Sequence, residues 1–212
     1  MSDIVDQINE VHRSVGHADT PQGEGRAVLL RRDYPAPVED VWAALTDPDR
    51  LRRWFLPVTG DLRLGGHYQL QGNAGGEILR CEPPRLLRVS WVFGEGAHSE
   101  VEVRLTPGDG PVTSFELEHI APLSPHWDTY GPGATGVGWD LALLGLGAYL
   151  SGSPIADPAA FETSPEAREF ATRSSEAWGA ALRATGADEA DVARMVRNTT
   201  AFYVPNPAAG QG

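Results

Sequence analysis

The middle of the chain alternates apolar and polar residues with a period of two, which is typical of half-buried β-strands. Gly, Pro or Asp residues follow each run and supply turn chemistry. The pattern predicts an antiparallel meander with one face in the core and the other in water. Strands are expected at residues 27–34, 62–70, 76–81, 87–93, 101–105 and 113–119.

Other segments have the helical period instead. Residues 38–45 place apolar side chains at i, i+3, i+4 and i+7, directly after Pro37, a residue that suits a helix start. Residues 48–55 follow as a second short helix, with Asp47 as its N-cap. A long helix is predicted from about residue 136 to residue 150.

The long helix is the predicted partner of the sheet. Its apolar stripe consists of Trp139, Leu143, Leu146 and Leu150. Gly145 and Gly147 lie inside it, although glycine costs roughly 1 kcal/mol against alanine in a helix. The two small residues leave room either for close packing or for a cavity.

The two ends of the chain lie outside this pattern. Ile4, Ile8, Val11 and Val15 are spaced as one helical face, and a linker is predicted at 16–25. Beyond Pro154 the composition changes, and two more helical faces predict a tail that packs on the domain or forms a homodimer through its helices. The predicted division is therefore 1–25, 26–152 and 153–212.

Composition narrows the class of protein. The chain has 212 residues, 41% of them hydrophobic, which suits one domain with an appendage. A net charge of -12 argues against nucleic acid and membrane as partners. The apolar run 141–150 is too short to span a bilayer, and no signal-peptide pattern is seen. The single cysteine, Cys81, fits a cytoplasmic protein.

The order of several short motifs is similar to that of a known superfamily. Pro35–Trp42 resembles the start of the first helix in SRPBCC (START-like) proteins. Further motifs resemble those of the branch named for the activator of Hsp90 ATPase. They are Thr46-Asp47-Pro48, Arg53-Trp54-Phe55, Leu64–Tyr68, Gly76–Leu79, Pro83–Leu86, Ser90-Trp91, Leu117–His119 and Gly138-Trp139. The resemblance covers about 26–152, and the tail looks like an extension found in some bacterial members.

The resemblance implies an α+β helix-grip fold, in which a curved antiparallel sheet wraps around the long helix. It also implies a cavity between the two that binds a small hydrophobic molecule. Tyr and Trp side chains are expected to orient that guest with their polar atoms. The predicted ligand-binding residues are Trp54, Tyr68, Leu70, Leu79, Trp91, Phe93, Val103, Phe115, Leu117, His119, Trp139, Leu143 and Leu146.

His119 is the polar residue with the most chemical interest. It is in phase with Phe115 and Leu117, so it should face the core. There it is either a general base or a structural histidine bonded inside the core, with Asp140 and Glu77 as candidate partners. The remaining histidines are scattered, so neither a metal nor a cofactor is expected.

Three functions remain open from the sequence. The first is a binding module that sequesters, carries or senses a hydrophobic ligand without chemistry. The second is an enzyme of the polyketide cyclase or aromatase kind, with His119 as general base. The third, suggested by the long helical tail and the acidic composition, is an Hsp90-type chaperone co-factor or another protein-interaction module. We expect a binding module rather than an enzyme.

Overall fold

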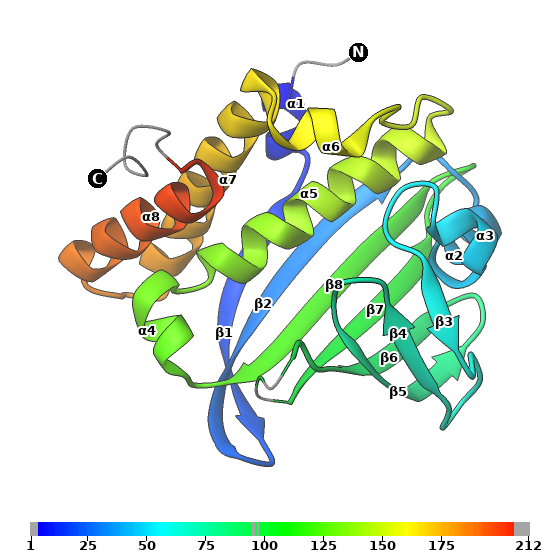
Figure 1. Ribbon diagram of the computed structural model, residues 1–212, viewed down its shortest axis with the longest axis horizontal. Helices are drawn as coiled ribbons and strands as arrows, with labels where there is room; N and C mark the ends of the chain where they lie inside the picture. Colours follow the sequence, from blue (N-terminus) through cyan, green and yellow to red (C-terminus); the bar gives the residue numbers. More distant parts are fainter. Residues whose placement is uncertain (1–3, 95, 97, 206–212) are drawn as a thin grey trace.

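The computed structural model describes residues 4–94, 96 and 98–205, which form an eight-stranded antiparallel sheet with helices on its concave side (Figure 1). The strand order is β1-β2-β8-β7-β6-β5-β4-β3. The strands are β1 (His12–Thr20), β2 (Gly23–Tyr34), β3 (Val58–Gly60), β4 (His67–Leu70), β5 (Gly75–Glu82), β6 (Leu86–Trp91), β7 (Ser99–Pro107) and β8 (Thr113–Pro122).

The helices form the second layer, and α5 runs diagonally across the sheet (Figure 1). The helices are α1 (Ile4–Asn9), α2 (Val38–Thr46), α3 (Pro48–Leu51), α4 (Pro125–Tyr130), α5 (Gly133–Leu150), α6 (Pro158–Glu162), α7 (Pro165–Arg183) and α8 (Glu189–Tyr203). Among the described residues, no helix has the length and apolar character that crossing a bilayer requires. The arrangement confirms the predicted α+β helix-grip fold.

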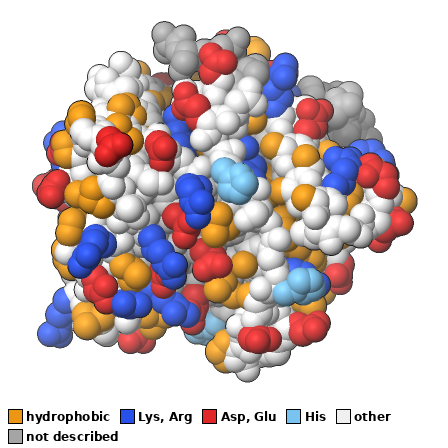
Figure 2. Space-filling view, turned by 180° about the vertical axis from the view of Figure 1, so that it is seen from behind, with side chains coloured by type: hydrophobic (Ala, Val, Ile, Leu, Met, Phe, Trp, Pro, Cys, Tyr) orange, Lys and Arg blue, Asp and Glu red, His pale blue; other side chains and the backbone are white. Residues whose placement is uncertain are grey.

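The alternation along the central strands is confirmed by burial. Val101, Val103 and Leu105 on β7 are buried, and so are Phe115 and Leu117 on β8. The opposite face is wet, and Figure 2 shows acidic and basic side chains interspersed over it. Cross-strand ion pairs such as Arg88 with Glu100 belong to this outer face.

Close packing, and not a void, explains the two glycines inside α5. A Cβ at Gly145 would lie 2.9 Å from the backbone oxygen of Trp54. A Cβ at Gly147 would lie 3.3 Å from the Arg32 guanidinium. The missing side chains therefore let α5 approach the segment after α3 and the strand β2.

The N-terminal segment differs from its prediction. The helix ends at Asn9, and the residues predicted as its continuation and as a linker form β1, a full edge strand paired with β2 from His12↔Arg31 to Thr20↔Gly23. Strand pairing satisfies every backbone group on the inner edge of this segment, which a linker would not. The side chain of Ile4, part of the predicted helical face, lies outside the described residues.

The C-terminal tail packs on its own domain. Helix α7 lies against α5, β1 and α1, and α8 lies against α7 and α4. Trp178 of α7 is fully buried in the same apolar core as Val137 and Leu143 of α5. Of the two predicted positions for the tail, the structure shows packing on the domain. The end of the predicted tail, including Pro207, lies outside the described residues.

Candidate ligand cavity

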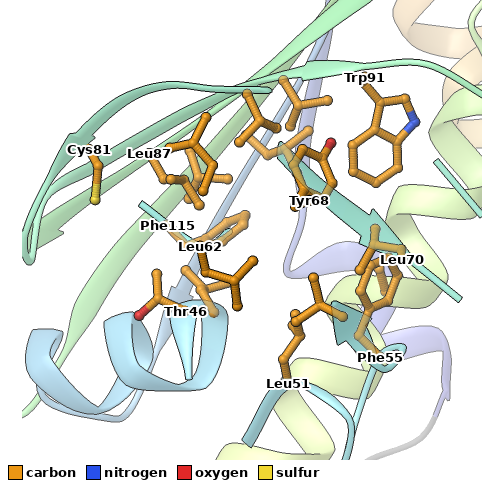
Figure 3. Close-up of a pocket in the computed structure, with 18 of the residues that line it drawn as sticks. Thr46, Leu51, Phe55, Leu62, Tyr68, Leu70, Cys81, Leu87, Trp91 and Phe115 are labelled. Carbon is orange, nitrogen blue, oxygen red and sulfur yellow. The ribbon is translucent and has the colours of Figure 1, made fainter. Parts of the chain in front are cut away.

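A cavity of about 200 Å³ lies between the sheet, α5 and the segment that follows α3. Figure 3 shows side chains from separate elements pointing into it, including Leu51 of α3, Tyr68 of β4 and Phe115 of β8. The loop that connects β3 to β4 contributes Leu62, Arg63 and Leu64. Since Leu62 and Leu64 are 41% and 64% exposed, this loop forms the mouth of the cavity.

Most of the predicted ligand-binding residues lie on the cavity wall. They come from five different elements and from the segment after α3, and they meet only because the sheet curves around α5. The predicted residues on the wall are Trp54, Tyr68, Leu70, Trp91, Val103, Phe115, Leu117, Trp139 and Leu143.

Four predicted residues do not line the cavity. Leu79 and Phe93 are 38% and 63% exposed. The pairing of β5 shifts between Ile78 and Arg80, so the irregularity leaves Leu79 out of phase and turned outward. Phe93 lies beyond β6, which ends at Trp91. Leu146 is buried in the core away from the cavity, and His119 lies behind its wall.

Several wall residues were not predicted. Leu87 and Val89 precede Trp91 on β6, and Val101 precedes Val103 on β7, so their place in the alternation contained the necessary signal. The alternation contains no such signal for the mouth of the cavity, because it predicts Leu62 and Leu64 within a strand and they lie in a loop. The other unpredicted wall residues are Leu45, Thr46, Leu51, Phe55, Val58, Ile78, Cys81 and Ala142.

Most polar atoms of the aromatic wall are bonded to the protein itself. The Trp54 indole N–H donates to the Ala44 carbonyl at 2.9 Å, and the Tyr68 hydroxyl donates to the Ser90 carbonyl at 2.8 Å. Burial raises the pKa of the Tyr68 hydroxyl, so this group stays protonated. The Trp54 N–H and the Tyr68 O–H therefore do not donate to a guest in this arrangement.

His119 is held by a directional chain of hydrogen bonds. The Trp139 indole N–H donates to Nδ1 of His119 at 3.0 Å, so Nε2 carries the ring proton. Nε2 then donates to the Ser99 hydroxyl at 2.8 Å, which donates to the Trp91 carbonyl at 2.7 Å. Burial lowers the pKa of His119 to about 4.

This chain of hydrogen bonds bears on the two roles considered for His119. A general base needs a free ring nitrogen within reach of the substrate, and both nitrogens of His119 have protein partners. The partners are Trp139 and Ser99, and neither is the predicted Asp140 or Glu77. The side chain of His119 is thus bonded in the way that the structural alternative expects.

The remaining polar groups at the cavity give it little charge. Arg63 at the mouth pairs with Asp61 at 2.8 Å, and the Thr46 hydroxyl donates to the Trp42 carbonyl. Burial raises the pKa of the Cys81 thiol, which disfavours the reactive thiolate. Within the described ranges, no group of three His, Cys, Asp or Glu side chains is arranged to hold a metal ion. The wall is suited to a neutral, apolar guest.

A curved antiparallel sheet that encloses an apolar cavity against a long helix defines a protein of the helix-grip class. The sequence profile of the family described as activator of Hsp90 ATPase homolog 1-like protein matches residues 35–151. The chain therefore belongs to this family, as the motifs in its sequence predicted. A search of curated proteins finds no match.

The solved structures of two other proteins are similar to this chain. The crystal structure of CalU16 from Micromonospora echinospora matches with a TM-score of 0.68 and 42% sequence identity. The match covers 82% of this chain and 98% of CalU16. DynU16, a protein of the dynemicin biosynthetic locus, is 28% identical, with a TM-score of 0.54 over 60% of this chain and 48% of DynU16.

The fold is also shared with an Hsp90 activator from Plasmodium falciparum. That protein is 24% identical, with a TM-score of 0.52 over 60% of this chain and 97% of the activator. At this identity the likeness concerns the fold alone.

Proposed function

We propose that the protein binds a small, neutral, largely apolar molecule in the cavity, and that it sequesters, carries or senses this molecule. The observation that carries the proposal is the wall itself, where rings such as Phe55, Trp91 and Phe115 surround about 200 Å³ of space. Affinity would come from burial of apolar surface, at about 25 cal/mol per Å².

The bonded state of the wall restricts the class of guest. A ligand with several hydrogen-bonding groups would lose water without gaining partners, because Trp54, Tyr68 and Trp139 already donate inside the protein. Aromatic rings pack favourably on aromatic rings. A neutral molecule with one or two rings therefore fits best. That DynU16 belongs to a biosynthetic locus supports a biosynthetic product as the source of such a guest.

The other two functions have weaker support. The cyclase alternative needs a free nitrogen on His119, which the bonds to Trp139 and Ser99 use. The chaperone alternative rests on the family name and on a shared fold. A cytoplasmic location and a homodimer through the C-terminal helices stay proposals, and a dimer would have to use the outer faces of α7 and α8.

Dye binding tests the proposed function. N-phenyl-1-naphthylamine is a neutral dye with two aromatic groups, a phenyl and a naphthyl, and its fluorescence rises in apolar surroundings. We expect saturable binding with one site per chain. Ala142→Phe places a ring inside the cavity, and it should weaken binding by about tenfold or more, since the guest loses its space.

Ala180→Phe is the matched control, because Ala180 lies on the exposed side of α7. It should leave dye affinity unchanged. Equal affinity of the wild type and Ala142→Phe would contradict the proposed site, and the absence of any saturable binding would contradict the proposed function.

A further inference from the structure

One buried carboxylate of α5, that of Asp140, is hydrogen-bonded to the C-terminal tail. Asp140 is 1% exposed and accepts a two-pronged ion pair from Arg13 of β1, at 3.0 Å from both Nε and Nη2. From α7, the Ser174 hydroxyl and the Trp178 indole N–H both donate to Oδ2. One side chain of α5 is thus held by groups from two other elements.

The charges around Asp140 explain why it is bonded so completely. Burial raises the pKa of the Asp140 carboxyl, while the Arg13 guanidinium and the bonds from Ser174 and Trp178 oppose that rise. A buried carboxylate without such donors would be costly. Removing one donor to Asp140 should therefore make the observed placement of α5 less stable.

Direct contact also fixes the distance between α5 and α7. A Cβ at Gly136 would lie 2.2 Å from the indole ring of Trp178, so α5 rests on this ring without any side chain between them. The ring is fully buried. The Trp178 ring therefore contacts α5 at Gly136, and its N–H bonds to Asp140 about one turn further along the helix.

The residue next to Asp140 forms part of the cavity wall. Trp139 bonds to His119, and its ring packs on that of Trp91 with centroids 5.0 Å apart. Ala142 and Leu143, three and four residues further along α5, also line the cavity. A rotation or shift of α5 about its contact with α7 would therefore move three wall residues together.

We propose that α7 is the positioning element of the cavity: Trp178 and Ser174, which do not touch the guest, set the place of Trp139 and its neighbours on the wall. The expected effect on ligand affinity rests on the proposed function, whereas the positioning of Trp139 does not. It assigns a task to the tail, whose packing on the domain would otherwise be only structural.

The test uses the full chain with three variants. Trp178→Phe keeps a buried ring and removes the N–H donor, and Ser174→Ala removes the second donor from α7. Val192→Ala is the control, because Val192 of α8 is fully buried beside Gly179 of α7 and loses packing without involving Asp140. All three are compared at a temperature where urea unfolding shows them folded.

The first measurement needs no ligand. The Trp139 indole N–H resonance, assigned among the six tryptophans with Trp139→Phe, reports the bond to His119. We expect it to move in Trp178→Phe and Ser174→Ala and to stay in place in Val192→Ala. An unmoved resonance in Trp178→Phe, or an equal shift in Val192→Ala, would overturn the inference.

The second measurement is the affinity for N-phenyl-1-naphthylamine. We expect Trp178→Phe to weaken it by about threefold to tenfold and Val192→Ala to leave it within about twofold. Unchanged affinity in Trp178→Phe would overturn the inference. If the wild type does not bind the dye, the proposed function fails, and the Trp139 resonance still decides whether α7 positions this wall.

Discussion

His119 shows how a residue with catalytic chemistry can serve a structural purpose. Its phase with Phe115 and Leu117 was readable from the sequence, and its 8% exposure confirms that it faces the core. Its partners were not readable, because Trp139 and Ser99 meet it only after α5 lies on the sheet. Alternation predicts which way a side chain points, and tertiary packing decides what it meets there.

The buried imidazole should make stability fall in mild acid. The unfolded chain takes up a proton near pH 6.5, while burial lowers the pKa of folded His119 to about 4. The stabilisation is therefore complete above pH 6.5 and is lost as the pH falls through 4, by about 3 kcal/mol in total. Urea unfolding at pH 7, 6, 5 and 4 measures this loss.

The variant that isolates this effect is His119→Gln, whose amide can accept from Trp139 and donate to Ser99. It should remove that part of the pH dependence, whereas His126→Gln, at an exposed position on α4, should keep it. A wild-type slope in His119→Gln would assign the acid sensitivity to other groups.

Regular strands were predictable, and irregular ones were not. The alternation located β7 and β8 because their pairing has no break across the predicted residues. In β5 the shifted pairing between Ile78 and Arg80 reversed the side of Leu79, and no residue type in that run signals such a shift. The strand β1 was missed because its inward residue Arg13 is charged and serves Asp140.

The glycines of α5 give a prediction for the helix as an element. Gly145→Ala should destabilise the protein by about 1–3 kcal/mol, since the new methyl meets the Trp54 backbone oxygen at 2.9 Å. Gly147→Ala meets the end of the Arg32 side chain at 3.3 Å and the Tyr34 ring at 3.5 Å, which is an ordinary contact, and a better helix former offsets the first.

The comparison of these two variants serves as its own control, because both replace glycine by alanine in the same helix. Chemical denaturation should therefore rank Gly145→Ala as the less stable of the two. The reverse order would mean that the segment containing Trp54 yields more easily than the Arg32 side chain.

At the scale of the whole molecule, the change of composition after residue 153 does not mark a boundary of folding. Trp178 and Ala171 of α7 belong to the same buried core as Val101 of β7 and Leu143 of α5. The sequence showed the helical faces of the tail, but it left open which surface they would cover. The periodicity of apolar residues could not predict a buried carboxylate with donors from β1 and α7, because it carries no information on which elements meet.

A shared core predicts one cooperative unfolding transition for the full chain. Removing residues 154–212 should abolish that cooperativity, because Asp140 would keep Arg13 but lose Ser174 and Trp178. Calorimetry and near-ultraviolet circular dichroism measure both effects. A truncated chain that melts sharply and binds the dye with full affinity would show that the tail is dispensable.

The bonds of Asp140 also bear on synthesis at the ribosome. Arg13, the first partner of Asp140 in the chain, is synthesised before any residue of the cavity wall. Trp178, the last partner, is synthesised after all of the wall residues. At one stage of synthesis the nascent chain therefore contains every residue of the cavity wall, while Asp140 of α5 still lacks its donors Ser174 and Trp178. We expect the affinity for that guest to mature late, once α7 has left the exit tunnel.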